Sequence, residues 1–224
     1  MKYLLLMFSF FKKKKRPQFW QDYEASFSEK TSEYAKETNF VVLDTETTGF
    51  HLKKDRIISI GAVKIKGYAI EVQHTFELYI HQNRFNPDTV KIHGITKNDL
   101  ANAISEEEAI SLFLKYIGNS VLVAHHKNFD LGMINQALNR MNLPKLQNKS
   151  LDTGSLYKGT RIISNLIDRE KKYSLDVVAE AFSIDTKDRH TAAGDAFITA
   201  IAFLKITGRL DKKGNLKLKE LFRY

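Results

Sequence analysis

The sequence predicts one α/β domain in which a mixed β-sheet is flanked by helices. Three strand-like segments follow one another at the start of the body, and further short strands then alternate with helix-like segments. The composition agrees, because 43% of the 224 residues are hydrophobic and only three are proline. Such a chain can form a substantial core, unlike a disordered or fibrous one.

The predicted strands are short apolar runs bounded by polar or glycine-containing turns. The first runs from Phe40 to Leu43, is continuous and rich in valine, and is closed by Asp44. This pattern is typical of a buried central strand. Further strands are expected at 56–65, 69–80, 121–124 and 150–153.

Helices are predicted where apolar residues recur at spacings of three and four. The segment 105–117 is the best marked, because Ser105 can cap its start and Glu108 follows three residues later. Residues 18–38 are expected to form a helical lead-in or a linker. Further helices are expected at 130–141, 174–182 and 191–206.

The net charge of +9 is unevenly distributed along the chain. Residues 1–38 carry +3 (eight basic, five acidic), 39–207 carry +2 (21 and 19), and 208–224 carry +4 (six and two). We therefore predict an N-terminal extension (1–38), a folded domain (39–207) and a basic C-terminal tail (208–224). Because the excess lies mostly in the ends, charge alone is weak evidence that the folded domain binds polyanions.

The N-terminus combines an apolar run, residues 3–11, with a basic run, residues 12–16. A secretory signal has the opposite order, and a bilayer span needs about 20 residues, so we expect no stable membrane insertion. A weak interfacial or docking element and a segment without function are both open interpretations. The chain has no cysteine, which excludes disulfides and thiolate metal sites and fits a cytoplasmic location.

Two carboxylates stand at the end of the first predicted strand. Residues two apart on a strand share a face, so Asp44 and Glu46 are expected a few ångströms apart. Two ionised carboxylates that close repel each other, and a divalent cation would stabilise both. The alternative is that one caps the following turn while the other is merely exposed.

Two later segments carry residues of the same chemistry. Asp130 follows the buried strand 121–124 at the start of a helix, where it is either a helix cap or a ligand. His190 and Asp195 can converge only if His190 lies on a loop and Thr191 caps the next helix. A histidine there is suited to act as a general base, because its ordinary pKa is near neutrality. A solvated loop histidine is the alternative.

Together, these segments resemble the three motifs of the DEDD 3′-to-5′ exonucleases, His variant. The matching stretches are 43–49 (LDTETTG), 124–130 (AHHKNFD) and 190–195, and 92–96 (IHGIT) matches a segment common in one subgroup. That subgroup comprises the proofreading exonucleases of bacterial replicative polymerases, namely the epsilon subunit and the exonuclease domain of the Gram-positive replicase. The resemblance covers about 39–206 and implies a ribonuclease H-like fold. It departs at His126, where relatives often carry Asn.

The resemblance implies a role for each matched residue. The metal carboxylates would be Asp44, Glu46, Asp130 and Asp195. His190 would be the general base. The residues beside the terminal nucleotide would be Thr45, Thr47, Gly49, His93 and Gly94.

The implied reaction is hydrolysis of a phosphodiester by two divalent cations, Mg²⁺ or Mn²⁺, with release of nucleoside 5′-monophosphates. Oxygen-rich ligation suits these hard ions. The expected partner is a single-stranded 3′ end of DNA, in proofreading during replication or in repair. Association with a DNA polymerase and a free-standing enzyme are both open, and the sequence does not indicate an oligomeric state.

Three other functions fit parts of the pattern. An exoribonuclease or oligonucleotide hydrolase of the same superfamily would use the same ions and differ in contacts to the 2′-hydroxyl. An aspartyl-nucleophile phosphatase also has a similar first motif, but Glu46 stands where it needs a second Asp. A non-catalytic nucleic-acid-binding module would require the loss of a motif residue, and all five are present.

Several polar residues near these segments have simpler interpretations. His125 is expected to be buried and hydrogen-bonded. Asp152 is expected to be structural, with a hydrogen bond to the helix that carries Asp195. A basic cluster is either a solvated surface or a phosphate contact; it comprises Arg161, Arg169, Lys171 and Lys172.

Overall fold

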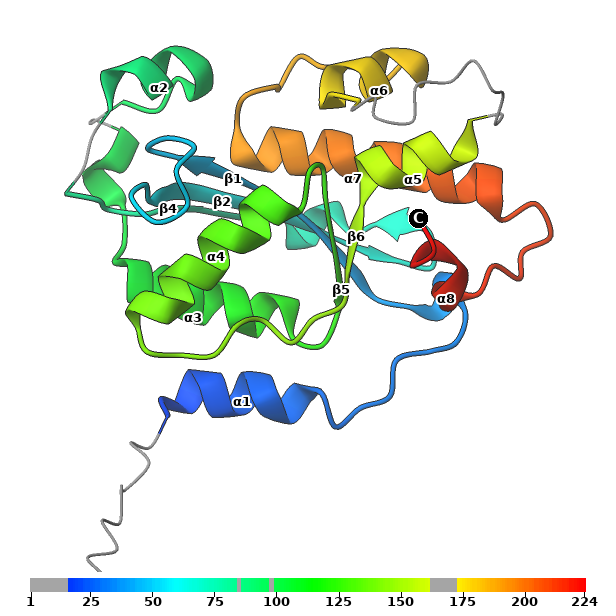
Figure 1. The fold of residues 1–224 in the computed structure, drawn as a ribbon, viewed down its shortest axis with the longest axis horizontal. Helices are drawn as coiled ribbons and strands as arrows, with labels where there is room; N and C mark the ends of the chain where they lie inside the picture. Colours follow the sequence, from blue (N-terminus) through cyan, green and yellow to red (C-terminus); the bar gives the residue numbers. More distant parts are fainter. Residues whose placement is uncertain (1–15, 84–85, 97–98, 162–172) are drawn as a thin grey trace, which may run out of the picture.

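A computed structural model describes residues 16–83, 86–96, 99–161 and 173–224, and it contains a six-stranded mixed sheet with helices on both faces (Figure 1). The strand order is β3-β2-β1-β5-β6, with β4 also paired to β2. β2 is antiparallel to β1, whereas β5 and β6 continue the sheet in parallel. The predicted fold class is therefore confirmed. The strands are β1 (Phe40–Thr47), β2 (Ile57–Lys66), β3 (Ala69–Ile70), β4 (Phe76–Tyr79), β5 (Val121–Ala124) and β6 (Ser150–Asp152).

The helices form two layers around this sheet. They are α1 (Gln18–Ser26), α2 (Pro87–His93), α3 (Glu106–Ile117), α4 (Asn128–Arg140), α5 (Thr153–Thr160), α6 (Leu175–Ala181), α7 (Ala192–Leu210) and α8 (Leu218–Leu221). α5, α6 and α7 cover one face, and α3 and α4 cover the other, with α1 packed beyond α3 (Figure 1). Among the described residues, no helix is both long and apolar enough to cross a bilayer.

The side-chain alternation of β1 divides the interior into two cores. Phe40 and Val42 pack on the side of α7, where the Phe40 ring lies 5.0 Å from the ring of Phe203. Val41 and Leu43 pack on the opposite side, with α3 and α4. The alternation continues to the end of the strand, so its two carboxylates face α7 and its two threonines face α4.

Three of the predicted helix starts are confirmed by their caps, whereas α4 begins at Asn128, two residues before its predicted start. The hydroxyl of Ser105 accepts a hydrogen bond from Glu108 N at the start of α3. Ser174 and Thr191 cap α6 and α7 in the same way. Each of these residues satisfies a backbone N–H that has no partner within its helix.

Four elements differ from the sequence prediction, one of them α8, which lies in the predicted tail. The expected strand 69–80 is interrupted by a 3₁₀ turn, Val72–His74, because β3 pairs with the end of β2 and β4 pairs with its beginning. α2 and α5 were not predicted. α5 follows β6 directly, since the side chain of Asp152 accepts a hydrogen bond from Ser155 N and caps it.

The segments predicted as extension and tail pack against the domain. Trp20 of α1 is fully buried in the core with α3, and Leu221 of α8 is buried in the core with α7. α7 itself continues past residue 207, the predicted end of the domain. The apolar run 3–11 and residues 12–15 of the basic run lie outside the described residues, as do three members of the predicted basic cluster, Arg169, Lys171 and Lys172.

Candidate active site

A glycine in β2 brings the start of α7 onto the sheet beside Asp44. Gly61 is the partner of Asp44 in the β1–β2 ladder. A Cβ atom at Gly61 would lie 2.1 Å from backbone atoms of Ala192 and Ala193, far inside van der Waals contact. Only glycine allows this approach, and the approach places the first turn of α7 next to the carboxylate-bearing end of β1.

Three carboxylates meet at this junction. Asp44 and Glu46 of β1 and Asp195 of α7 each offer one oxygen atom, and these three atoms lie within 4.8 Å of one another. Asp195 is buried, and the other two are partly buried. Oxygen ligands at this spacing, with no thiolate, fit a hard divalent cation such as Mg²⁺ or Mn²⁺.

Asp130 lies beside this cluster, on the α4 side of β1. It stands in the first turn of α4, and its Oδ1 accepts hydrogen bonds from Thr45 N (3.0 Å) and Thr45 Oγ1 (2.7 Å). Among the described residues, the group that could share one ion comprises the other three carboxylates and not Asp130. The hydroxyl of Thr45 donates to Asp130 and does not face the open surface. The family resemblance instead implied that Thr45 contacts the terminal nucleotide.

Burial raises the pKa values of three of these carboxyl groups, and mutual repulsion adds to the rise at Asp44 and Glu46. Burial, followed by the charges of Asp130, Asp195 and Glu46, raises the pKa of Asp44 well above its ordinary value. Burial and the charges of Asp195 and Asp130 raise the pKa of Glu46 to about 8. Burial raises the pKa of Asp130 to about 7, against the hydrogen bonds from Thr45. Without a bound cation, these carboxyl groups therefore hold protons near neutral pH, where ordinary carboxyl groups have lost them.

His190 lies at the rim of the cluster, on the loop before α7. Its side chain is exposed, its φ is +67°, and its backbone N donates to Asp195 Oδ1 at 3.3 Å. Thr191 caps α7 through Gly194 N at 3.1 Å, so the loop and the helix meet as the spacing predicted. The imidazole faces solvent while its own backbone is tied to a carboxylate of the cluster.

Arg189 is a residue of the site that sequence reasoning missed. Its guanidinium forms an ion pair with Asp195 and a second one with Asp176 of α6. In the sequence, only its position next to His190 indicates that Arg189 belongs to the site. Folding brings its two partners, Asp176 and Asp195, close to it.

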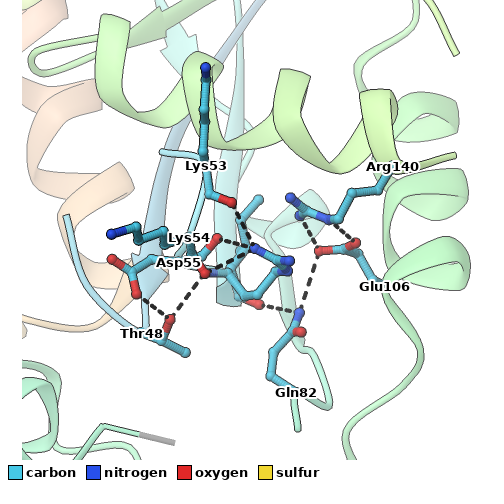
Figure 2. Close-up of polar contacts among 9 residues, drawn as sticks. Thr48, Lys53, Lys54, Asp55, Gln82, Glu106 and Arg140 are labelled. Atoms are coloured by element: carbon cyan, nitrogen blue, oxygen red, sulfur yellow. Dashed lines mark hydrogen bonds and ion pairs between the residues drawn. The ribbon is translucent and has the colours of Figure 1, made fainter. Parts of the chain in front are cut away.

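The loop after β1 is closed by its own side chains. Thr47 Oγ1 donates to Gly49 O at 2.8 Å, and a Cβ at Gly49 would lie 2.6 Å from Asp55 Oδ2. Figure 2 shows the neighbouring contact, in which Thr48 Oγ1 donates to Asp55 Oδ1 at 3.1 Å. Thr47 and Gly49 are both buried and shape this loop.

A second set of contacts in Figure 2 joins the two helices behind this loop. Arg140 of α4 donates to Glu106 of α3 through Nε at 2.8 Å and through Nη2 at 2.6 Å. Gln82 Nε2 donates to Ile57 O at 2.9 Å and so ties the segment after β4 to the start of β2. Gln82 and Glu106 thus link the start of β2, which follows the loop 48–56, to the two helices.

His93 and Gly94 end α2 close to the start of α7. Gly94 has φ +69° and closes the helix, and His93 is buried, with Nδ1 accepting from Ile95 N at 3.0 Å. Burial lowers the pKa of His93, so the ring is neutral near pH 7. Both residues line a cavity of about 220 Å³ together with Thr191.

An aromatic pair, the exposed Phe50 and the partly buried Phe129, lies next to two of the motifs and was not foreseen from the sequence. Phe50 directly follows the TETTG segment and is 76% exposed. Its ring lies 5.9 Å from that of Phe129, which precedes Asp130. Position beside two motifs was the available signal, but exposure is a property of the folded chain.

The interpretation of the neighbouring polar residues is confirmed for His125. Its Nδ1 lies 2.9 Å from Thr153 Oγ1, its Nε2 lies 2.8 Å from Tyr173 O, and burial lowers its pKa to about 4. Asp152 is structural, but its hydrogen bonds go to Ser155 N of α5 and to Lys127 N, not to α7. His126 has φ +60°, a conformation that Asn adopts more readily than His.

Arg161 is the described member of the predicted basic cluster. It is exposed at the end of α5, and its Nη1 donates to the hydroxyl of Tyr157 at 2.8 Å. The contact agrees with both interpretations of the basic cluster, namely a solvated surface and a contact to substrate phosphates.

The sheet order, the two helix layers and the carboxylates at the end of β1 define the ribonuclease H-like fold of exonucleases. Two solved structures agree. Exonuclease X in complex with 5′ overhanging duplex DNA has a TM-score of 0.59 at 23% identity and covers 78% of this chain and 93% of its own. The zinc-bound E. coli ExoI–ssDNA complex has a TM-score of 0.67 at 17% identity over 84% of this chain and 43% of its own.

The chain belongs to the RNase T exonuclease family, whose model matches residues 41–203. It is 34% identical over 172 residues to DNA polymerase III subunit epsilon of Aquifex aeolicus (76% of this chain, 81% of the relative). It is 35% identical over 191 residues to DNA polymerase III PolC-type of Caldanaerobacter subterraneus subsp. tengcongensis, covering 85% of this chain but 13% of that relative. The predicted family is thus confirmed. Its members are DEDD 3′-to-5′ exonucleases, which are hydrolases that use divalent metal ions.

Proposed function

We propose that this chain degrades DNA from a single-stranded 3′ end and releases nucleoside 5′-monophosphates, in proofreading or repair. The supporting observation is the junction of β1 and α7, where Asp44, Glu46 and Asp195 converge beside the exposed side chain of His190. Carboxylates that can hold divalent cations, next to a group that can take up a proton, are the elements of metal-assisted phosphodiester hydrolysis.

The carboxylates divide into two sets of ligands under this proposal. Asp44, Glu46 and Asp195 would hold one ion, and Asp130 together with Asp44 would hold a second. Bound Mg²⁺ or Mn²⁺ would neutralise charge on the phosphate and stabilise the leaving oxygen. The chain contributes the rigidity of this arrangement: Thr45 fixes the orientation of Asp130, and Gly61 fixes the position of α7.

His190 would accept the proton of the attacking water. Its side chain is exposed, so water and substrate can reach the imidazole. Its backbone bond to Asp195 keeps the loop next to the carboxylates. A neutral imidazole nitrogen can take up this proton and then pass it to solvent.

The aromatic pair favours an unpaired end over a duplex. Phe50 offers an open ring surface on the loop that follows Glu46 in the chain, and Phe129 of α4 packs against it. Stacking on such rings binds single-stranded bases with little sequence preference. His93 and Gly94 would border the terminal nucleotide from the α2 side, and Thr47 and Gly49 would do so from the loop after β1.

Degradation of a labelled oligomer tests the proposal. Purified protein with Mg²⁺ should shorten 5′-labelled single-stranded DNA stepwise from its 3′ end, and EDTA should stop it. Asp44→Asn and His190→Ala should each lower the rate by about 10²-fold or more. Glu107→Gln, an exposed carboxylate of α3, serves as the control with an unchanged rate. Undiminished activity in either site variant would contradict the assignment.

Comparison of matched DNA and RNA oligomers separates this proposal from an exoribonuclease. The cations act on the phosphate, so sugar preference depends on contacts to the 2′-hydroxyl. We expect faster cleavage of DNA; RNA cleaved at an equal or higher rate would favour the exoribonuclease. A pull-down from native extract tests association with a polymerase, which the named relatives suggest.

A further inference from the structure

A single guanidinium links the carboxylate cluster to helix α6. Arg189 Nη1 donates to Asp195 Oδ2, while Nε and Nη2 donate to the two carboxylate oxygens of Asp176 at 2.7 and 3.2 Å. The side chain of Arg189 is only 16% exposed, whereas that of Asp176 is 63% exposed. Asp176 therefore binds the guanidinium of Arg189 from the solvent side. Nη1 of Arg189 is left to donate to the carboxylate cluster.

The positive charge of Arg189 acts on more than its bonded partner. It opposes the rise in the pKa of Asp44 and of Glu46 that burial and their neighbours cause. An arginine keeps its charge at every pH at which the protein is folded. The cluster thus contains a permanent cation of its own.

Both oxygens of Asp195 are engaged by the loop before α7. Oδ2 accepts from Arg189, and Oδ1 accepts from His190 N at 3.3 Å. A divalent ion held by the cluster must draw on these oxygens, and it would meet a fixed positive charge there. Arginine and ion would then compete for one carboxylate.

We propose that Arg189 is a positioning residue that serves as the internal counter-cation of the site and competes with a divalent ion for Asp195. This inference rests on the metal site of the proposed function. Without an ion, Arg189 holds Asp195 in place and relieves repulsion among the carboxylates. With an ion, the bond to Asp195 gives way, and the bonds to Asp176 keep the guanidinium within reach.

Two substitutions distinguish the effect of the Arg189 charge from the effect of any positive charge on the same loop. Arg189→Gln removes the counter-cation, and Lys187→Gln removes an exposed charge two residues earlier. In EDTA, Arg189→Gln should melt at a lower temperature than the wild type. It should bind Mn²⁺, without nucleic acid, roughly tenfold more tightly, the factor that corresponds to a weak charge-assisted hydrogen bond. Lys187→Gln should match the wild type in both measurements.

The outcomes distinguish this inference from the proposed function. Equal Mn²⁺ affinities of Arg189→Gln and wild type would overturn the counter-cation role and leave the metal site intact. A wild type that binds no Mn²⁺ would overturn the metal site and this inference with it. Weaker Mn²⁺ binding by Arg189→Gln would also contradict competition, because it would make the arginine a support for the ion.

A measurement on the unaltered protein covers the case in which Arg189→Gln does not fold. The side-chain N–H signals of Arg189 can be followed by NMR while diamagnetic Mg²⁺ is added to metal-free protein. The Nη signals should shift as the bond to Asp195 is lost, whereas the Nε signal should stay near its original position because Asp176 retains it. Unchanged Nη signals at saturating Mg²⁺ would overturn the proposal.

Discussion

The side chains of Glu46 and Asp130 carry protons in the metal-free fold that they would release on unfolding. Their folded pKa values, about 8 and about 7, lie above the unfolded values of 4.5 and 3.8. Between these limits the folded protein binds more protons than the unfolded chain, so its stability falls as pH rises. We expect the melting temperature in EDTA to decline from about pH 5 to pH 8.

The same experiment has an internal control. Glu46→Gln removes one of the two groups and should flatten the decline, and saturating Mg²⁺ should flatten it further because the ion replaces the protons. Melting temperatures at four pH values in this range, with and without Mg²⁺, provide the measurement. A wild-type melting temperature that rises across the window would contradict the pKa shifts.

Phe50 allows a prediction about substrate binding. Loss of a stacking ring costs about 1–3 kcal/mol per base, so Phe50→Ala should raise KM for single-stranded DNA about tenfold while kcat changes less. Val72→Ala is the matched control, because Val72 is also exposed and apolar but belongs to the turn between β3 and β4. A KM that is equal in both variants would exclude stacking on Phe50.

Sequence spacing located the acidic residues but not their partners. Asp44 and Glu46 were placed on one face by strand periodicity, and the start of α7 followed from Thr191 as its cap. Arg189 and Phe50 were missed because their roles depend on contacts and exposure that only the folded chain creates. Asp176, for example, reaches Arg189 from another helix.

At the scale of elements, the contact between β2 and α7 decides whether the site forms. Gly61→Ala would place a methyl group against the backbone of Ala192, which must move. Overpacking of this kind costs about 1–3 kcal/mol, and the displaced helix carries Asp195 away from Asp44. We expect Gly61→Ala to lower the melting temperature and to weaken Mn²⁺ binding, as measured by titration.

A glycine within α7 itself provides the control for this prediction. A Cβ at Gly208 meets nothing within 4 Å, so Gly208→Ala fills open space within a helix. It should raise stability by about 0.5–1 kcal/mol and leave Mn²⁺ affinity unchanged. Tight Mn²⁺ binding by Gly61→Ala would show that the α7 contact does not set the ligand geometry.

The elements that the sequence did not predict share a physical cause. α5 is a short helix whose start depends on a cap, Asp152, that was interpreted as part of a strand. The break between β3 and β4 arises because each of them pairs with a different part of β2. The alternation of polar and apolar residues along the segment does not reveal which part that is. Helices with strong caps and long apolar periodicity, such as α3 and α7, were predicted well.

At the scale of the molecule, the ends of the chain support the core that the sequence assigned to the middle. Trp20 is fully buried against α3, and Trp20→Ala should cost about 3–5 kcal/mol. A chain cut to residues 39–207 loses α1, α8 and the end of α7, so we expect it to unfold at a much lower temperature. Circular dichroism melts of both proteins test this, and wild-type stability of the cut chain would support the predicted division into domain and tails.

The approach of Ala192 to Gly61 also has a consequence during synthesis of the chain. β1 emerges from the ribosome early and α7 late, so for most of translation the carboxylates of β1 lack their third member. The contact joins segments that are far apart in the chain, between Gly61 and Ala192. Such contacts form slowly, because the chain loses conformational entropy before the stabilising contacts are made. Under the proposed function, a nascent chain would therefore lack a complete metal site, and hydrolysis of nucleic acid would begin only after α7 has docked.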